Sequence, residues 1–405
     1  MLFFVTVMNF IDRQALSVLE GDITKEFHLT ATQYGSIVSA FRAGMLLGEF
    51  PMGMLMDRIG VRIGLSLAVL WWSLGSGLHT VAHSLWQFRF FRFWLGTGEC
   101  GNYSGGNKVV AQWFPVRERA LAIGIFNSAS MLGAFVAAFL IIPLRNHYGW
   151  RMGFLIPSLV GALWVGVWWF FYRQPHEHPS LTEAEARHIV SDVAPEQTTA
   201  PTNWQLLRLP QTWGLILCRF WVGPVVEFYM NWMPKYFRDV RGLSFAKSGY
   251  FSSATFIFGD IGSIGGGLAA AWLIKKGFEV KSARRATLFF GAALCLLSFA
   301  VPLMQNLPLA IGAIALVLLG HTFLSANMFA SVSDVFPNSA VARVTGLTGV
   351  ANGVSGMLFP YITGKIVDHS SYVPVFFMAA LMPMIGILIL FATLKNYQRV
   401  EMKNA

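Results

Sequence analysis

The sequence predicts an all-α membrane protein with twelve transmembrane helices in two six-helix bundles. Hydrophobic residues make up 55% of the 405 residues and charged residues 12%, with a mean hydropathy of +0.54. Apolar stretches long enough to cross a bilayer recur along the chain, and one long polar stretch divides them six and six. The net charge of +10 is spread over short loops rather than gathered in one stripe, which argues against a nucleic-acid partner.

The twelve expected spans follow from the length of each apolar stretch and from the polar or Gly/Pro breaks between them. About 20 apolar residues are needed to cross the hydrocarbon core as a helix. The expected spans are 2–23, 32–56, 61–82, 84–111, 118–143, 149–172, 211–237, 245–274, 284–304, 307–333, 341–367 and 372–395.

Loop charges predict the orientation. Most Lys and Arg fall on one side, in the loops at 58–62, 117–119, 173–208 and 275–285, at Arg343 and after residue 395. The opposite side carries only Lys25, Arg145, Arg151, Arg238, Arg241 and Lys247. Because positive loops stay in the cytoplasm, both termini are expected there.

The polar stretch 173–210 is rich in Pro, His, Glu and Thr and cannot bury a core of its own. We therefore expect an N-terminal bundle over 1–172, a cytoplasmic linker over 173–210 and a C-terminal bundle over 211–405. Within the linker, Ser180-Leu-Thr-Glu183 has a capping-box pattern and predicts a short helix to about Val193.

The two halves repeat weakly. In the fifth span Pro115 is followed nine residues later by Gly124 and then by Asn127; in the eleventh, Pro337 is followed nine residues later by Gly346 and then by Asn352. Two parallel repeats with binding groups at the midplane are typical of an alternating-access transporter.

Four charges lie inside apolar spans, namely Asp12, Arg13, Arg92 and Glu99. A charge at membrane depth costs roughly 2.5–3.5 kcal/mol on insertion scales, which favours an ion or substrate pathway. Arg92 and Glu99 are about 10 Å apart along one helix face, and Gly96 between them is expected to leave room for a cavity. A carboxylate whose arginine partner comes and goes can bind and release a proton.

The segment Gly53-Met-Leu-Met-Asp57-Arg58-Ile-Gly60-Val-Arg62 resembles the signature loop of the major facilitator superfamily, and Arg92-Phe-Trp-Leu-Gly96 resembles its fourth-helix motif. The resemblance implies a conformational latch containing Gly53, Asp57, Arg58 and Gly60. Gly53 is expected to let helices approach and Gly60 to allow the tight turn.

Further motifs resemble the anion:cation symporter branch, and within it the hexuronate and galactonate transporters. They are Asn9-Phe-Ile-Asp-Arg-Gln-Ala-Leu16, Trp113-Phe-Pro-Val-Arg-Glu-Arg-Ala120, Gly124-Ile-Phe-Asn127, Pro234-Lys-Tyr236, Ser325-Ala-Asn327, Ser333-Asp-Val-Phe-Pro337 and Tyr372-Val-Pro-Val-Phe376. The resemblance implies that Asp12 and Glu99 carry protons and that Arg13 holds a substrate carboxylate. It implies that Arg92 tunes Glu99; direct contact of Arg92 with the substrate stays open. The alternative is a static charge network that only fixes helix packing.

Other polar and aromatic residues at depth are weaker substrate candidates. The amides suit sugar hydroxyls or helix-to-helix hydrogen bonds, the rings suit stacking on a sugar or core packing, and the lysine suits either substrate contact or snorkelling. These candidates are Asn9, Asn127, Asn327, Asn352, Tyr229, Trp232 and Lys108. Unassigned ionisable groups, which either add a contact for a more acidic ligand such as a sugar diacid or pair internally, are Arg42, Glu49, Glu227, Asp260 and His321.

We therefore expect a monomeric bacterial inner-membrane symporter that imports a hexuronate together with protons, without a cofactor or metal. The alternatives are a transporter of another organic anion, such as galactonate or glucarate, and a receptor of the same fold that binds without transport. A membrane enzyme ranks last because the sequence has no metal cluster, nucleophile elbow or phosphate-binding loop in a fitting context.

Overall fold

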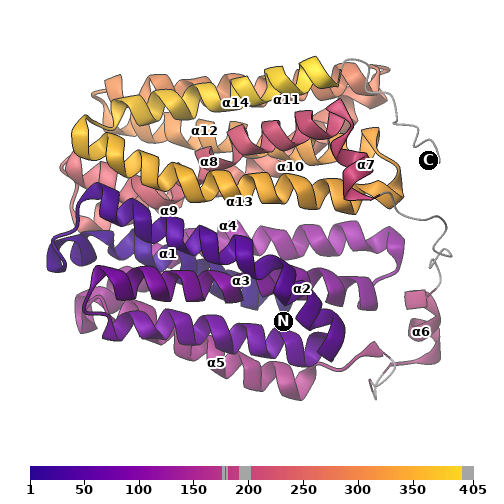
Figure 1. Ribbon diagram of the computed structural model, residues 1–405, viewed down its shortest axis with the longest axis horizontal. Helices are drawn as coiled ribbons and strands as arrows, with labels where there is room; N and C mark the ends of the chain where they lie inside the picture. The colour runs from indigo at the N-terminus through magenta and orange to yellow at the C-terminus, as the bar shows by residue number, and fades with distance from the viewer. Residues whose placement is uncertain (176–177, 179–180, 191–201, 395–405) are drawn as a thin grey trace. The chain divides into compact units, whose positions relative to one another are not determined.

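The computed structural model describes the chain except for residues 176–177, 179–180, 191–201 and 395–405 (Figure 1). It divides into two compact units. Unit 1 comprises Met1–Glu196 with Phe245–Ser253, and unit 2 comprises Gln197–Ser244 with Ala254–Ala405.

In the described part of Met1–Glu196, unit 1 contains five long helices and two short elements. They are α1 (Leu2–Glu26), α2 (Ala31–Leu78), the 3-10 turn η1 (His79–Val81), α3 (Leu85–Trp113), α4 (Val116–Tyr148), α5 (Met152–Phe171) and α6 (Glu183–Val190). Most of α9 (Phe245–Thr255) also belongs to this unit.

Unit 2 is likewise helical in its described residues. Its elements are α7 (Asn203–Leu207), α8 (Pro210–Asp239), α10 (Ile257–Lys275), α11 (Val280–Cys295), η3 (Leu296–Phe299), η4 (Val301–Leu303), α12 (Leu307–Val335), α13 (Asn338–His369) and α14 (Val373–Thr393).

Three of the expected spans do not appear as separate, continuous helices. The second and third spans are continuous in α2 except at Gly60, where φ is 76° and ψ is 161°. The eighth span is divided at Phe256 into α9 and α10. Among the described residues, eight helical stretches are long and apolar enough to cross a membrane by length and composition alone.

Glycines set the distance between α2 and α3. A Cβ on Gly44 or Gly96 would collide with the backbone of the facing helix, at Phe93 and Phe41 respectively. A Cβ on Gly48 would likewise collide with the backbone of Thr97. Small residues of this kind let membrane helices pack backbone to backbone. The expectation that Gly96 leaves room for a cavity is therefore wrong, because α2 fills that space.

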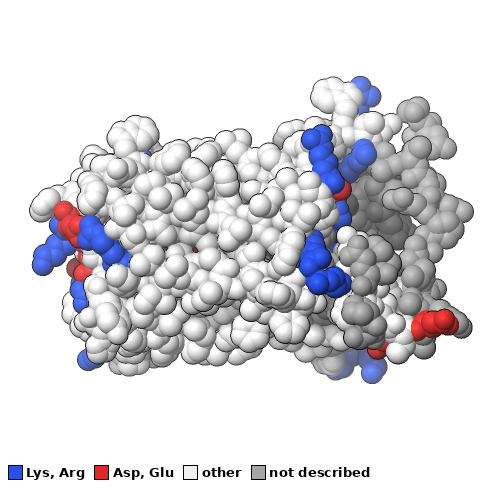
Figure 2. Space-filling view, turned by 90° about the horizontal axis from the view of Figure 1, so that it is seen from below, with Lys and Arg blue, Asp and Glu red and all other residues white. Residues whose placement is uncertain are grey.

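Charged side chains gather at the two ends of the face shown in Figure 2 and leave a broad band between them with almost none. At one end of unit 1, Arg145 of α4 forms an ion pair with Asp22 of α1 at 2.5 Å. Next to it, Arg151 reaches Glu26 at 2.7 Å. Ion pairs at the helix ends thus tie α1 to the α4–α5 turn without placing charge in the apolar band.

The linker helix α6 begins differently from the sequence prediction. Its cap is Thr182, whose hydroxyl accepts a hydrogen bond from the backbone N–H of Glu185 at 3.3 Å, while the Glu185 carboxylate accepts from the Thr182 backbone N–H at 3.0 Å. These hydrogen bonds hold the pKa of Glu185 below its usual range. Ser180 and Val193, named in the prediction, lie outside the described residues.

Gly60 gives a direct test of the turn between the two halves of α2. Gly60→Ala is expected to lower the free energy of unfolding by about 1–3 kcal/mol, because its backbone conformation is almost restricted to glycine. Thermal unfolding in detergent measures the loss. Gly53→Ala is the matched control, since a Cβ there would meet nothing within 4 Å. Equal free energies of unfolding for the two variants would contradict the role of Gly60 in the turn.

Candidate functional site

The central feature of unit 1 is an ion pair between α1 and α3. Both Nε and Nη2 of Arg13 contact the same oxygen of Glu99, Oε2, at 2.9 and 2.8 Å. The side chain of Glu99 is 0% exposed and that of Arg13 is 11% exposed. Asn9, one turn earlier on α1, accepts a weak bond from Arg13 Nη2 at 3.4 Å. The predicted charges Arg13 and Glu99 therefore meet directly.

Phenylalanine rings surround the guanidinium group of Arg13. Its central carbon lies 4.3 Å from the ring centre of Phe10 and 5.3 Å from that of Phe41. Apolar walls weaken dielectric screening and so strengthen the attraction between Arg13 and Glu99. The same walls raise the cost of separating the pair unless another charge replaces one partner.

Asp12 points away from this pair. Its Oδ1 accepts a hydrogen bond at 2.7 Å from the hydroxyl of Ser76, near the end of α2, and its side chain is fully buried. Asp12 and Arg13 therefore contact different helices, because adjacent residues on a helix point about 100° apart.

His79, which was not among the residues predicted from the sequence, holds the helix end that carries Ser76, the partner of Asp12. Its Nδ1 lies 2.8 Å from the carbonyl oxygen of Gly75 and 3.2 Å from that of Ser76, and its ring stacks on Phe154 at 4.9 Å. Ser76 and His79 gave no sequence signal because serine and a lone histidine are common in apolar helices. Their role follows only from the packing of η1 against α5.

Arg92 lies beside both acids. It is 1% exposed, its Nη1 donates to the carbonyl oxygen of Arg13 at 3.4 Å, and it interacts electrostatically with Asp12 and Glu99. It thus supports the charge balance of the cluster rather than pairing closely with one acid. The sequence placed Arg92 and Glu99 on one face correctly but did not reveal that Arg13 takes the close contact.

Several buried polar atoms of the cluster have no hydrogen-bond partner among the described residues. They are Asn9 Nδ2, Asp12 Oδ2, Arg92 Nε, Arg92 Nη2 and Glu99 Oε1. Each such atom costs roughly 1–3 kcal/mol while it stays unpaired, so binding a proton or a polar ligand here is favoured. The unpaired Oε1 gives Glu99 an oxygen that can take a proton while Oε2 still faces Arg13.

The residues resembling the superfamily loop form a separate group. Lys108 of α3 donates to Asp57 Oδ1 at 2.8 Å and to the carbonyl oxygen of Met56 at 2.7 Å. Lys108 is thus engaged with the loop acid, nine residues beyond Glu99. Arg58 is exposed. The expectation that Gly53 permits close helix approach is wrong in this structure, because the space around its Cα is open.

Three candidates of unit 2 are occupied by protein contacts. The hydroxyls of Tyr229 and Ser298 are 2.7 Å apart, and both Tyr229 and Trp232 are buried in the core. The amide of Asn327 accepts from Arg284 at 2.9 Å and donates to the carbonyl oxygen of Gly266 at 3.0 Å. In this conformation these three side chains stabilise helix packing.

The two asparagines on the repeated helices are more accessible. Asn127 is exposed on α4, and Asn352 is half-buried on α13. A Cβ on Gly223 of α8 would collide with the amide oxygen of Asn352, so the glycine makes room for that side chain. Each asparagine thus retains the accessibility that hydrogen bonding to a sugar hydroxyl requires.

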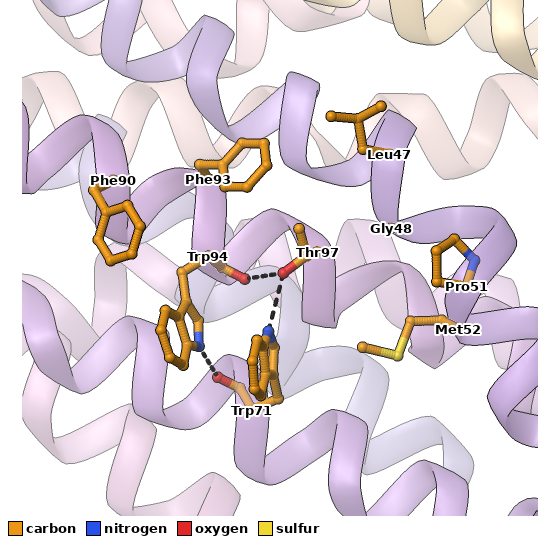
Figure 3. A pocket seen from close by; sticks show the side chains of 9 residues that line it. All are labelled: Leu47, Gly48, Pro51, Met52, Trp71, Phe90, Phe93, Trp94 and Thr97. Carbon is orange, nitrogen blue, oxygen red and sulfur yellow. Dashed lines mark hydrogen bonds between the residues drawn. The ribbon is translucent and has the colours of Figure 1, made fainter.

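A hollow between α2 and α3 has a different character (Figure 3). Its lining is almost entirely apolar and includes the stacked rings of Trp71 and Trp94, 4.4 Å apart, with the Trp71 N–H bonded to the Thr97 hydroxyl at 2.9 Å. No charged side chain lines it. A polar, anionic ligand does not fit this lining, whereas a hydrocarbon chain does.

The chain is similar to known transport proteins over nearly its whole length. The Major Facilitator Superfamily model matches residues 2–281 and 268–404. The hexuronate transporter of Escherichia coli (strain K12) is 27% identical over 402 residues, covering 98% of this chain and 93% of the relative. The probable galactarate/D-glucarate transporter of the same strain is 27% identical over 420 residues, covering 98% and 94%.

The fold also matches a solved structure. The crystal structure of a D-xylose-proton symporter superposes with a TM-score of 0.75 at 13% identity, covering 98% of each chain. The predicted all-α fold with twelve transmembrane helices in two bundles is confirmed, as is the resemblance to sugar-acid transporters.

The buried pair gives a stability prediction. Arg13→Gln is expected to lower the free energy of unfolding by about 3–5 kcal/mol, because it leaves Glu99 buried without its partner. The double variant Arg13→Gln/Glu99→Gln should recover most of the loss. The measurement is a double-mutant cycle by thermal unfolding in detergent.

The pair Asp22–Arg145 is the matched control, since its side chains are 19% and 32% exposed. Its coupling energy should be smaller because solvent screens the charges. If the changes in the free energy of unfolding at Arg13 and Glu99 were additive, the ion pair would not be stabilising.

Proposed function

Because this chain belongs to the major facilitator superfamily of transporters, we propose that it is a proton-coupled symporter that imports a sugar acid by alternating access. The observation that carries the proposal is the buried pair of Arg13 and Glu99. A symporter that couples a proton to a carboxylate needs one arginine that an internal acid and the substrate can occupy in turn.

The coupling step is a competition for Arg13. When Glu99 is ionised, it neutralises the guanidinium group. When Glu99 takes a proton, the guanidinium group loses its partner, and a substrate carboxylate can bind to the same fork of N–H donors. Substrate and proton therefore bind together, and release of the proton on the cytoplasmic side lets Glu99 displace the substrate.

Asp12 is the second proton carrier in this proposal. It is buried as fully as Glu99, lies beside Arg92, and keeps one carboxylate oxygen without a partner among the described residues. One proton per monoanion moves no net charge, whereas two protons move one positive charge, worth about 2.3 kcal/mol per 100 mV. Both stoichiometries are compatible with two acids.

The transported molecule is a small sugar acid. A hexuronate such as glucuronate or galacturonate is the first substrate to test, because a hexuronate transporter is similar over nearly the whole chain. Galactonate and glucarate are the alternatives, the second supported by the similarity to a galactarate/D-glucarate transporter. Asn127 and Asn352 are proposed to bind sugar hydroxyls.

The remaining proposed roles follow the same scheme. Asp57, Arg58 and Gly60 are proposed to form the conformational latch, with Lys108 paired to Asp57. The protein is proposed to act as a monomer in the bacterial inner membrane, with both termini in the cytoplasm as the loop charges indicate.

Transport by reconstituted protein tests the proposal. Wild type is expected to accumulate labelled glucuronate in proteoliposomes under an inward proton gradient. Glu99→Gln should lose this accumulation, because an amide carries no transferable proton, but should still exchange internal for external substrate. Arg13→Ala should lose both activities, because the substrate carboxylate has no partner.

The control is Glu49→Gln, which changes an exposed acid on a neighbouring spanning helix. It should transport as wild type does. Gradient-driven accumulation by Arg13→Ala at the wild-type rate would exclude this mechanism. Saturable binding without any flux in wild type would favour the receptor alternative.

A further inference from the structure

The apolar hollow between α2 and α3 lies wholly within unit 1 and has no role in the mechanism above (Figure 3). Its volume of about 280 Å³ is below the range of roughly 300–1,000 Å³ that is typical of small-molecule sites. Three of its lining side chains, Leu47, Trp71 and Phe90, are exposed. The hollow therefore opens onto the apolar surface of the spanning helices, which lipid covers.

The polar side-chain atoms that line the hollow are already paired. The indole N–H of Trp71 donates to the Thr97 hydroxyl at 2.9 Å, and the indole N–H of Trp94 donates to the Trp71 carbonyl oxygen at 3.1 Å. The Thr97 hydroxyl in turn donates to the Trp94 carbonyl oxygen at 2.7 Å. A polar ligand would therefore lose hydrogen bonds to water and gain none here, whereas a hydrocarbon chain loses nothing.

A cation lies on α3 just before the hollow begins. Arg89 directly precedes Phe90, the first α3 residue of the lining, and is about 12 Å along the helix axis from Thr97, the last one. Its guanidinium group lies over the exposed ring of Trp86, 5.4 Å from the ring centre. Tryptophan and arginine near a helix end are typical of the depth at which lipid headgroups meet the hydrocarbon.

Arg89 uses only one of its three nitrogens within the protein. Its Nε donates to the hydroxyl of Ser36 on α2 at 2.8 Å. Its Nη1 and Nη2 make no hydrogen bond or ion pair with the described residues and are not buried, so both reach the surface. Two charged N–H groups are therefore available to an anion, and phosphate oxygens are among the acceptors that arginine binds best.

Arg89 and the hollow lie along the same seam between α2 and α3. The seam runs from the hydrogen bond of Arg89 to Ser36 to the close approach of Gly48 to Thr97, and residue numbers rise in the same direction on both helices. The cation is thus at the head of the seam, and the apolar hollow follows it. A phosphate at Arg89 and a hydrocarbon chain in the hollow can belong to one molecule.

We propose that this hollow binds one acyl chain of an anionic phospholipid whose phosphate is held by Arg89. The positive charge of Arg89 favours an anionic headgroup over a zwitterionic one, and the unpaired Nη1 and Nη2 donate to its phosphate. The lipid is distinct from the transported molecule. Its binding is measured without transport, so a failure of this proposal leaves the proposed function intact.

The test is photolabelling in lipid nanodiscs. The purified protein is placed in phosphatidylcholine nanodiscs that contain a minor fraction of phosphatidylglycerol with a diazirine near the end of one acyl chain. Mass spectrometry then compares labelling of residues 47–52 and 90–97 with labelling of α5, whose exposed Leu163 and Phe170 are an internal reference for bulk lipid. Wild type is expected to show preferential labelling of the hollow, and a phosphatidylcholine probe with the same chain should show less.

Substitutions separate the headgroup contact from the acyl-chain contact. Arg89→Gln should lower the labelling ratio for phosphatidylglycerol by about 5- to 10-fold, toward that of phosphatidylcholine, because a partly screened charge-assisted contact is lost. Arg89→Lys keeps the charge and should retain most of the preference. Leu47→Trp fills the hollow and should lower the ratio for both probes.

Arg208→Gln is the matched control. Arg208 also lies over an aromatic ring, Trp204, at 5.6 Å, but outside the spanning helices and away from the hollow. This variant should label as wild type does, and all variants should elute as wild type does in size-exclusion chromatography.

Equal labelling of the hollow and of α5 in wild type would overturn the proposal, because bulk lipid then covers the hollow without preference. A preference for phosphatidylglycerol that persists in Arg89→Gln would overturn it as well, because the headgroup is then held elsewhere. Loss of that preference in Arg89→Gln, together with loss of labelling by both probes in Leu47→Trp, supports the site.

Discussion

The ion pair between Arg13 and Glu99 is the interaction on which the candidate site depends. It joins α1 to α3, and the charges around it depend on its state: Arg92 donates to the Arg13 carbonyl oxygen and interacts with both acids. In an apolar environment neither partner can stand alone at low cost. A change in the protonation of Glu99 therefore has to be answered by another anion at Arg13, which is the physical basis of the proposed coupling.

The packing of α2 against α3 keeps this pair in place. Gly44, Gly48 and Gly96 bring the two helix backbones into contact, so α3 cannot move away from α2 without opening a gap along the interface. Ser76, near the end of α2, donates to Asp12, and His79 of η1 lies against the carbonyl oxygens of Gly75 and Ser76. Close glycine packing thus determines which acid contacts which arginine.

The two units distribute their intramembrane charges differently. In unit 1 two acids and two arginines lie together, so the cluster is balanced when all four are ionised. In unit 2 the described ion pairs join Arg284 to Asp334 and Lys235 to Asp239 one to one. A balanced cluster is suited to proton exchange, because a proton on one acid leaves an arginine without its full countercharge.

The sequence by itself determined the membrane class and the all-α fold, and it drew attention to Asp12, Arg13, Arg92 and Glu99 as charges within apolar spans, because hydropathy and the cost of buried charge are properties of composition and spacing. Only the tertiary structure decided the partners. Spacing on one helix suggested that Arg92 was the neighbour of Glu99, but Arg13 on another helix makes the close contact. Lys108, Asn327 and Tyr229 were equally ambiguous, since a polar group in a helix binds either a ligand or a neighbouring helix. The structure places all three against protein atoms because contacts between helices depend on packing that no single helix encodes.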